Sequence, residues 1–318
     1  MPFLTTKPRL LELLVLLLVL SVGEARSDEC KVSTWGSEDE IGAANLISAQ
    51  SIIQASKLVK QGKTQHLGII IDRHTPAFGS RSLSMQILQP GQENGRMPFP
   101  NGFSYNDDVF QGWFGIGSQL DGLAHGGQHG VYYNCLLGID FVQVTGVTKL
   151  GIEKVPPLVA RGVVLDMAGY FGTDFLEGGK SFSAKEVREA AEQQKVEIRE
   201  GDVVLFYTGW TDHMLSADPK KWGSIEPGIA EDVASYLASK NVLAVGADTW
   251  GVDVVPPEKE GRPFQGHITL LKENGIYIFE VMNSGSLVRD NISEFLFVFG
   301  PIRMRGAVQS FANPIAIY

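Results

Sequence analysis

Two spacings of apolar residues alternate along the chain. Between Ser48 and Gly62, apolar side chains recur at helical spacing, which predicts an amphipathic helix with Ser48 as its N-cap and Gly62 just after its end. A second helix is predicted from the capping box Ser183–Glu186 to about residue 194, and a third amphipathic helix over 228–239. These helices predict a chain with several packed layers rather than an all-β domain.

Continuous apolar runs lie between and after these helices, and we interpret them as strands. The predicted strands cover 66–72, 162–167, 202–210, 242–248, 276–280 and 296–299. Runs such as DVVLFYTGW at 202–210 are typical of strands buried on both faces. Helices alternating with buried strands favour the α/β class. There is no internal repeat and no low-complexity linker, so we predict a single domain over 26–318, with a Pro- and Gly-rich loop at 89–102.

The first 25 residues have a different pattern from the rest of the chain. Lys7 and Arg9 precede an almost wholly apolar run at 10–22, and Gly23 and Ala25 then form a small-x-small pattern. This order is typical of a secretory signal peptide, 1–25, with cleavage after Ala25. The alternative is an uncleaved membrane anchor. We therefore expect a secreted protein, outside the cell or in the endomembrane lumen, with no stable membrane association after cleavage.

Composition and charge narrow the classes of partner. The chain has 318 residues, 44% hydrophobic and 20% charged, and a net charge of −9. An acidic chain lacks the basic footprint of a nucleic-acid-binding protein, so we expect a small-molecule partner instead. In an oxidising compartment, Cys30 and Cys135 could form one disulfide, and Asn291 lies in a glycosylation sequon.

The segment GSQLDGLAHGGQHG, 117–130, concentrates polar side chains among five glycines. In a strand, Gln119 and Asp121 point to one face, and the glycines allow a turn that returns His125 to the same face. A carboxylate and an imidazole together suit zinc or manganese. The alternative is a solvated glycine-rich loop, to which His129 belongs in either case.

A second polar pair follows near the C-terminus. His267 precedes the apolar run 276–279, and Glu280 ends that run, where a buried carboxylate needs a cation or hydrogen-bond donors. It is either a metal ligand or general acid/base facing His125, or a strand-end residue paired with Arg303 or Arg305. Among the other histidines, His74 is a candidate for the site, whereas we expect His66 and His213 to be structural or solvated.

These residues resemble the metal-dependent cyclase and kynurenine-formamidase family, whose signature is His-x-Gly-Thr-His-x-Asp-x-Pro-x-His. Asp121 and the last signature His, at His125, match, and further blocks resemble the family in the same order. The blocks are 35–47, 160–168, 201–210, 245–253 and 267–283. Two signature histidines fall on Gly115 and Gln119, and the signature Pro falls on Leu123. The chain looks closer to a branch with Gln at the second position and a Tyr-Asn pair, here Tyr133 and Asn134.

The resemblance implies a single-domain, mixed-sheet α/β/β barrel-like fold of the swivelling-domain type and a hydrolase for amide or ester bonds. Implied substrates are cyclic amides, lactones or N-formyl arylamines, as for an arylformamidase. The family usually forms dimers or higher oligomers, so we expect a homo-oligomer. A non-catalytic protein that retains the fold, and a cyclase or lyase, are the alternatives.

The resemblance also assigns roles to individual side chains. One divalent metal, zinc or manganese, would be held by Asp121, His125, His267 and Glu280. His125 or Glu280 would move the proton during hydrolysis. The substrate side of the site would include Gln119, His74 and Tyr133.

Overall fold

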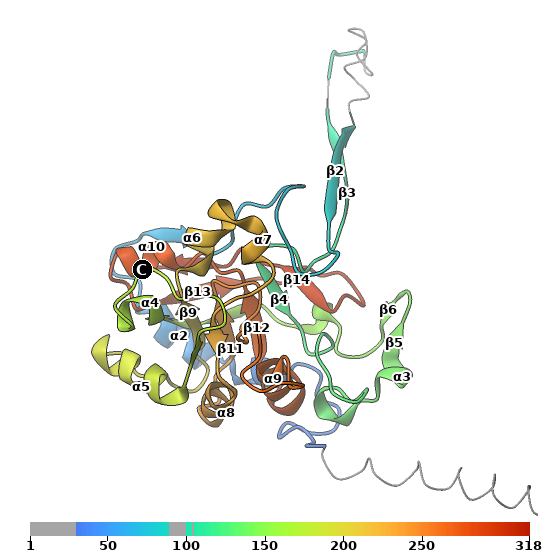
Figure 1. Cartoon of the computed structure of the whole chain (residues 1–318). Coiled ribbons are helices and arrows are strands. Elements are labelled where there is room, and N and C mark those ends of the chain that lie inside the picture. Colours follow the sequence, from blue (N-terminus) through green and yellow to red (C-terminus); the bar gives the residue numbers. More distant parts are fainter. Residues whose placement is uncertain (1–29, 89–99, 104) are drawn as a thin grey trace, which may run out of the picture.

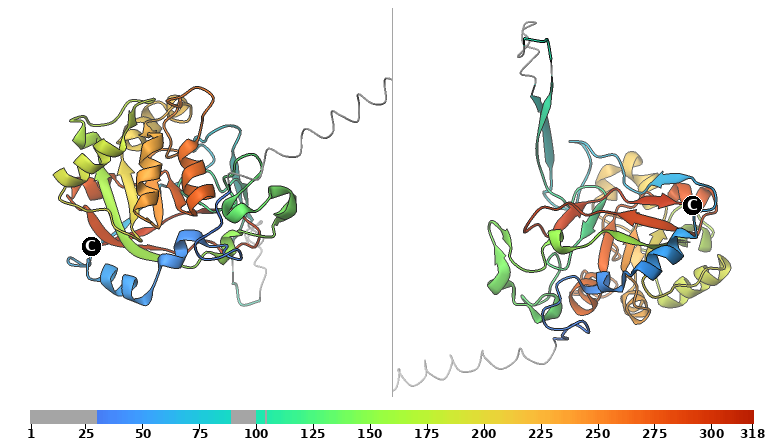
Figure 2. Two further views of the ribbon diagram at one scale, coloured as in Figure 1. Left: turned by 90° about the horizontal axis from the view of Figure 1, so that it is seen from below. Right: turned by 180° about the vertical axis from the view of Figure 1, so that it is seen from behind.

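The computed structural model describes residues 30–88, 100–103 and 105–318 (Figure 1). The predicted signal peptide, 1–25, and most of the predicted loop at 89–102 lie outside the described residues. The described chain forms one mixed α/β domain around a large, curled, nine-stranded sheet (Figures 1 and 2). The predicted fold class is therefore confirmed.

Four parallel strands form the middle of this sheet because each of them is an apolar run that is buried throughout or nearly so. The flanking strands are all antiparallel. The parallel strands are β7 (Leu158–Asp166), β9 (Val203–Tyr207), β11 (Ala244–Ala247) and β12 (Tyr277–Glu280). Beyond β7 lie β13 (Glu294–Phe299), β15 (Ile315–Ile317) and β1 (Thr64–His66); beyond β12 lie β4 (Gln119–Asp121) and β14 (Gln309–Phe311).

The register between β4 and β12 decides which side chains share a face. Gln119 lies opposite Glu280, and Asp121 lies opposite Ile278. Directly opposed residues point to the same face, and residues two apart on a strand do so as well. Gln119, Asp121 and Glu280 are therefore on one face of the sheet.

Capping residues define where several of the helices begin. Ser48 accepts a hydrogen bond from the Ser51 N–H, and Ser183 accepts one from the Glu186 N–H, each in a complete capping box. Two predicted bounds change: the first helix ends at Ser56 rather than near Gly62, and the helix predicted over 228–239 begins at Glu231. The longer helices are α2 (Ala49–Ser56), α5 (Ala184–Gln193), α6 (Trp210–Ala217) and α8 (Glu231–Ser239); shorter ones are α3 (Gly138–Phe141), α4 (Met167–Tyr170), α7 (Pro219–Trp222), α9 (Gln265–His267), the π-helix η5 (Ile268–Glu273) and α10 (Gly285–Arg289).

The strand predicted over 66–72 is wrong beyond His66. The backbone N–H of Gly68 donates to the Asn313 side chain, and that of Ile69 donates to the Ser118 hydroxyl, so neither joins a strand ladder. Ile70 is 96% exposed, which removes the reason to expect a buried strand. An apolar run can satisfy its backbone through side chains of other segments, and sequence spacing does not show this.

A hairpin that the apolar pattern did not predict projects from the domain. Its strands are β2 (Leu83–Leu88) and β3 (Asp107–Gly112), which pair antiparallel and stand away from the rest of the molecule (Figure 1). We call β2 and β3 the arm. Smaller two-stranded sheets join β5 (Val142–Gln143) to β6 (Gly146–Val147) and β8 (Ser181–Phe182) to β10 (Gly228–Ile229).

A disulfide joins Cys30 to Cys135, with the two Cα atoms 5.5 Å apart. The neighbouring residues reinforce the same attachment. The Asn134 amide donates to the carbonyls of Gly36, Ser37 and Asp39. The N-terminal segment is therefore held against the domain by a covalent bond and by hydrogen bonds. No helix within the described ranges is long and apolar enough to cross a membrane.

Candidate metal centre

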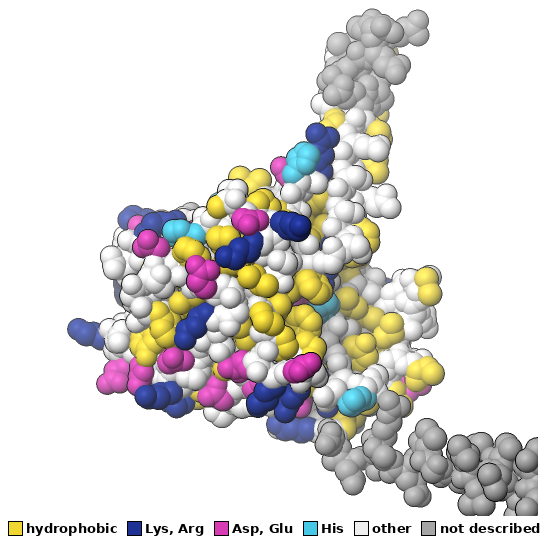
Figure 3. Space-filling model, viewed as in Figure 1, with side chains coloured by type: hydrophobic (Ala, Val, Ile, Leu, Met, Phe, Trp, Pro, Cys, Tyr) yellow, Lys and Arg dark blue, Asp and Glu magenta, His cyan; other side chains and the backbone are white. Residues whose placement is uncertain are grey.

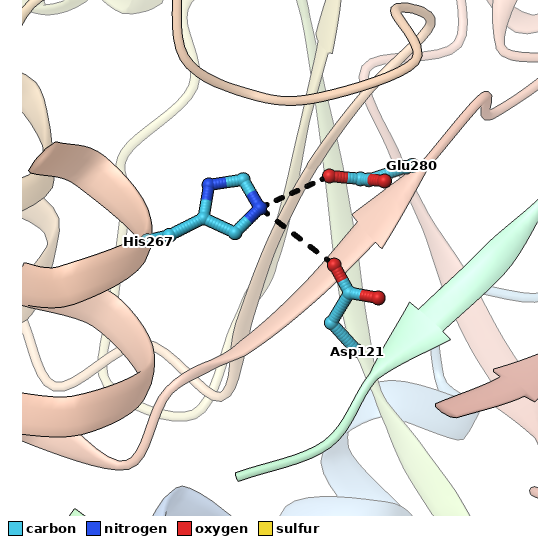
Figure 4. Close-up of side chains that lie close together, drawn as sticks. All are labelled: Asp121, His267 and Glu280. Atoms are coloured by element: carbon cyan, nitrogen blue, oxygen red, sulfur yellow. Dashed lines mark hydrogen bonds and ion pairs between the residues drawn. The ribbon is translucent and has the colours of Figure 1, made fainter. Parts of the chain in front are cut away.

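Three side chains from three different elements converge on one point of the sheet (Figure 4). Asp121 ends β4, Glu280 ends β12, and His267 lies at the end of α9. One potential ligand atom from each lies within 4.8 Å of the other two. His267 Nε2 is 3.1 Å from Glu280 Oε1 and 3.8 Å from Asp121 Oδ2. A carboxylate, a second carboxylate and an imidazole at this separation form a set of ligands for a divalent metal.

Local backbone geometry explains how these residues reach the site. A Cβ atom at Gly122 would lie 2.9 Å from the Val308 carbonyl oxygen, so glycine permits the close approach that ends β4. The turn that follows is closed by the His125 N–H, which donates to the Gly122 carbonyl. His267 is fixed by Asp253, which accepts from both its backbone N–H and its ring Nδ1, the latter at 2.6 Å. That ring contact leaves Nε2 directed at the two carboxylates.

Asp121 provides the observation that tests whether a metal fits. Its side chain is fully buried, and Oδ2 has no hydrogen-bond partner among the described residues. Burial alone would raise the pKa of Asp121, but His125 and His267 outweigh it and lower this pKa to about 2. A buried, ionised oxygen without a donor is costly unless a cation lies beside it. The residues present therefore fit a divalent metal ion.

The pKa values of Glu280 and His267, which form a triad with Asp121, also reflect a need for positive charge beside the two carboxylates. Burial, and then the charge of Asp121, raise the pKa of Glu280 to about 7. Burial opposes the charged form of His267, yet its contacts with the carboxylates of Asp121, Asp253 and Glu280 raise its pKa well above the ordinary value. Without metal, a proton on His267 supplies the positive charge that the carboxylates require. A metal ion must displace that proton, so metal affinity should rise with pH.

Gln119 points into the site, as the strand alternation predicted. Its amide Nε2 donates to Glu280 Oε2 at 2.6 Å and to Asp121 Oδ1 at 3.2 Å. Gln309 donates a further hydrogen bond, 2.7 Å long, to Asp121 Oδ1. Two amides thus occupy one side of the carboxylates and leave Asp121 Oδ2 and Glu280 Oε1 facing His267.

His125 lies beside the triad and not within it. Its Nε2 is 3.9 Å from Asp121 Oδ1, and its ring centroid is 6.5 Å from that of His267. Burial lowers the pKa of His125, and Asp121 only partly offsets that effect. A neutral imidazole that is partly exposed to a cavity is suited to accept a proton.

A cavity of about 430 Å³ opens onto the metal centre. The aromatic rings of Phe78 and Trp250 stack at 4.6 Å with 9° between their planes, and Phe264 meets Phe78 edge-on at 6.2 Å. The cavity is lined by Phe78, Arg81, His125, Gly126, Gly127, Tyr132, Trp250, Pro263, Phe264, His267, Ile268 and Glu280. The three polar side chains therefore adjoin an apolar surface formed by the rings of Phe78, Trp250 and Phe264, which we call the aromatic wall.

Some residues that the sequence placed at the site lie elsewhere. His74 is exposed and accepts a hydrogen bond from Arg73, outside the cavity lining. The hydroxyl of buried Tyr133 donates to Asp39 at 2.6 Å under the N-terminal segment, and its neighbour Tyr132 lines the cavity. His129 is exposed, as expected for a loop residue. Glu280 bonds to His267 and Gln119 rather than to Arg303 or Arg305, which are exposed.

Sequence reasoning missed Asp253, Arg81 and the aromatic wall. Asp253 could have been found, because it closes the block at 245–253 just after the predicted strand 242–248. Arg81 lies 34 residues before its contact Gly115, and local spacing gives no signal of that contact.

Comparison with known proteins is consistent with this architecture. Residues 65–254 match a family model described as "Putative cyclase". A solved structure described as a novel cyclase superposes with a TM-score of 0.80 at 28% identity, over 89% of this chain and 96% of that one. Isatin hydrolase A from Labrenzia aggregata superposes with a TM-score of 0.61 at 17% identity, over 85% of this chain and 98% of that one. For the isatin hydrolase from Ralstonia solanacearum, the TM-score is 0.59 at 19% identity, over 80% and 91%. No curated protein matches the chain in sequence.

Proposed function

The chain belongs to the cyclase family, and from that premise we propose that it is a metal-dependent hydrolase of an amide or ester bond. The observation that carries the proposal is the ionised Oδ2 of buried Asp121, which has no hydrogen-bond partner among the described residues and lies beside Glu280 and His267. We assign Asp121, His267 and Glu280 as ligands of one zinc or manganese ion. The bond would belong to a cyclic amide, a lactone or an N-formyl arylamine, the classes that the family resemblance implies; the structural neighbours described as isatin hydrolases favour the cyclic amide.

The bound metal would supply Lewis-acid activation of water and of the scissile carbonyl. The other functions belong to side chains of this chain. His125, kept neutral by burial, accepts a proton from the attacking water at Nε2. His125 can then pass this proton to the leaving group, since Glu280 is occupied as a metal ligand. Asp253 fixes the orientation of His267, and the aromatic wall excludes water from one side of the substrate.

Elemental analysis combined with an activity screen tests this proposal. We expect about one equivalent of metal per chain and hydrolysis of some lactones, cyclic imides or formanilides that stops on chelation. Asp121→Asn should lower metal affinity about 10- to 100-fold or more, since loss of outer-sphere partners already costs that much. His129→Gln, from the same glycine-rich segment, is the matched control and should keep its metal. Full activity after complete chelation would refute the mechanism; a metal-free, inactive wild type would favour a non-catalytic protein.

We also propose that the protein is secreted. The basic, apolar and small-residue order of 1–25 supports this, and so does the Cys30–Cys135 pair, because disulfides persist in oxidising compartments. Protein recovered from the medium should begin near Arg26, and reduction should raise its mass by that of two hydrogen atoms. Protein that stays inside the cell would contradict secretion, and recovered protein that begins at Met1 or carries two free thiols would contradict signal-peptide cleavage or the disulfide.

A further inference from the structure

Arg81 contributes a positive charge to the cavity that opens on the metal centre. It precedes the arm, is half-buried, and lines the cavity together with His125 and Glu280. Within the described part of the chain it forms no ion pair with a carboxylate. Among the described residues its one hydrogen bond runs from Nη1 to the Gly115 carbonyl oxygen at 3.0 Å. Since a guanidinium carries five N–H donors, most of them remain available to a ligand.

Gly115 is the residue that makes room for this guanidinium. A Cβ atom at position 115 would lie 2.7 Å from Arg81 Nη1 and 2.8 Å from Cζ. Such distances are too short for real contacts, so any side chain at position 115 would push the guanidinium aside. The hydrogen bond thus positions Nη1, and the absence of a Cβ atom at position 115 leaves room for the guanidinium in the cavity wall.

The charge of Arg81 reaches the catalytic side chains. It is among the groups that lower the pKa of both His125 and Glu280. With no ion pair to a carboxylate of the described chain, the guanidinium in the cavity lining can pair with an anionic group that enters the cavity.

The aromatic wall starts three residues before Arg81. Phe78 stacks on Trp250, and Phe264 meets both Phe78 and the ring of His267 edge-on. Planar apolar rings favour a planar apolar ligand through stacked or edge contacts. The cavity thus combines a flat apolar surface with a fixed fork of cationic donors.

We propose that Arg81 binds a carboxylate carried by the substrate, so that the site selects planar, apolar acids over their neutral counterparts. The guanidinium fork matches a carboxylate in geometry and charge. The inference rests on the proposed function only in taking the ligand to be the substrate. Arg81 is then a specificity-determining residue, and the acid group is a part of the substrate that does not react.

Binding of benzoate and of benzamide, a neutral molecule of nearly the same shape, tests the inference by calorimetry without any turnover. The wild-type protein should bind benzoate at least about tenfold more tightly than benzamide. Arg81→Gln should lose that preference, with benzamide affinity changed less than about twofold, and Arg81→Lys should restore part of it. The preference should persist after chelation, because it belongs to the guanidinium and not to the metal.

Two further variants provide a second test of the Arg81 contact and a control. Gly115→Ala keeps Arg81 but displaces its guanidinium, so it should also weaken benzoate binding. It tests the same contact if Arg81→Gln folds poorly. Arg73→Gln removes an exposed arginine of the same segment and should change nothing. Equal affinity of the wild type for both probes, a preference retained in Arg81→Gln, or a preference lost on chelation would each overturn the inference. A protein without metal or hydrolysis that still prefers benzoate through Arg81 would refute the proposed function and leave the anion site standing.

Discussion

At the scale of single residues, the metal centre depends on how two buried carboxylates are kept together. The Gln119 amide donates to both Glu280 and Asp121, which relieves part of their repulsion without adding charge. A neutral imidazole at this position would instead offer a metal ligand. The amide therefore favours a single cation between Asp121, Glu280 and His267, and not a second metal on the other side of the carboxylates.

A further buried carboxylate, outside the metal centre, makes the stability of the folded state depend on pH. Asp248 follows β11; its Oδ1 accepts from the backbone N–H and the hydroxyl of Thr208, but Oδ2 has no partner within the described residues. Burial raises the pKa of Asp248 to about 7, although the Thr208 hydrogen bonds oppose the shift. The folded state therefore binds this proton more tightly than the unfolded chain, where the ordinary value is 3.8.

This shift predicts that the folded state loses stability as pH rises. The contribution of Asp248 is fully present below pH 3.8 and disappears by about pH 7, at up to about 1.4 kcal/mol per pH unit. In chelated protein, the Tm of the wild type should therefore fall between pH 5 and pH 8. The Tm of Asp248→Asn relative to that of the wild type should rise over the same range. Differential scanning calorimetry at both pH values measures this difference. Asp174→Asn, at an exposed aspartate, is the control; a difference between Asp248→Asn and the wild type that is the same at pH 5 and pH 8 would contradict the argument.

At the scale of elements, local sequence patterns correctly predicted the features that depend on nearby residues, namely the buried strands and the starts of two helices. The parallel strands follow from continuous apolar runs, and the starts of α2 and α5 follow from Ser48 and Ser183. Strand 66–72 failed because its backbone partners come from Asn313 and Ser118, far away in the chain. An apolar run indicates burial, but the partner that satisfies the backbone is set by tertiary structure.

The side chains of the candidate site were predictable from local patterns, but the contacts that bring them together were not. Strand alternation placed Gln119 and Asp121 on one face, and the end of an apolar run marked Glu280. The antiparallel register of β4 against β12, which brings these residues together, has no local signal in the sequence. Nor does the contact of Arg81 with Gly115, because the residues between them include the arm.

At the scale of the whole molecule, the arm lacks the support that a hairpin needs. An isolated two-stranded hairpin is only marginally stable in water, and this one projects from the domain (Figure 1) with apolar side chains on the side drawn in Figure 3. The exposed apolar residues are Met85, Ile87, Leu88, Val109 and Phe110. A surface of this kind on a projecting element is typical of a protein–protein contact.

We predict that a second copy of this chain covers the arm, since the family resemblance implies a homo-oligomer and symmetric dimers are the commonest assembly of soluble chains. Light scattering at micromolar concentration should report twice the mass of a mature chain. Met85 and Ile87 lie on one face of β2, so Met85→Ser with Ile87→Ser should raise the dissociation constant at least about tenfold, because burying one such side chain is worth about 1.5–3 kcal/mol. Gln86→Ser, on the opposite face of the same strand, is the matched control and should leave the dimer intact. A wild-type protein with the mass of one chain would contradict this prediction.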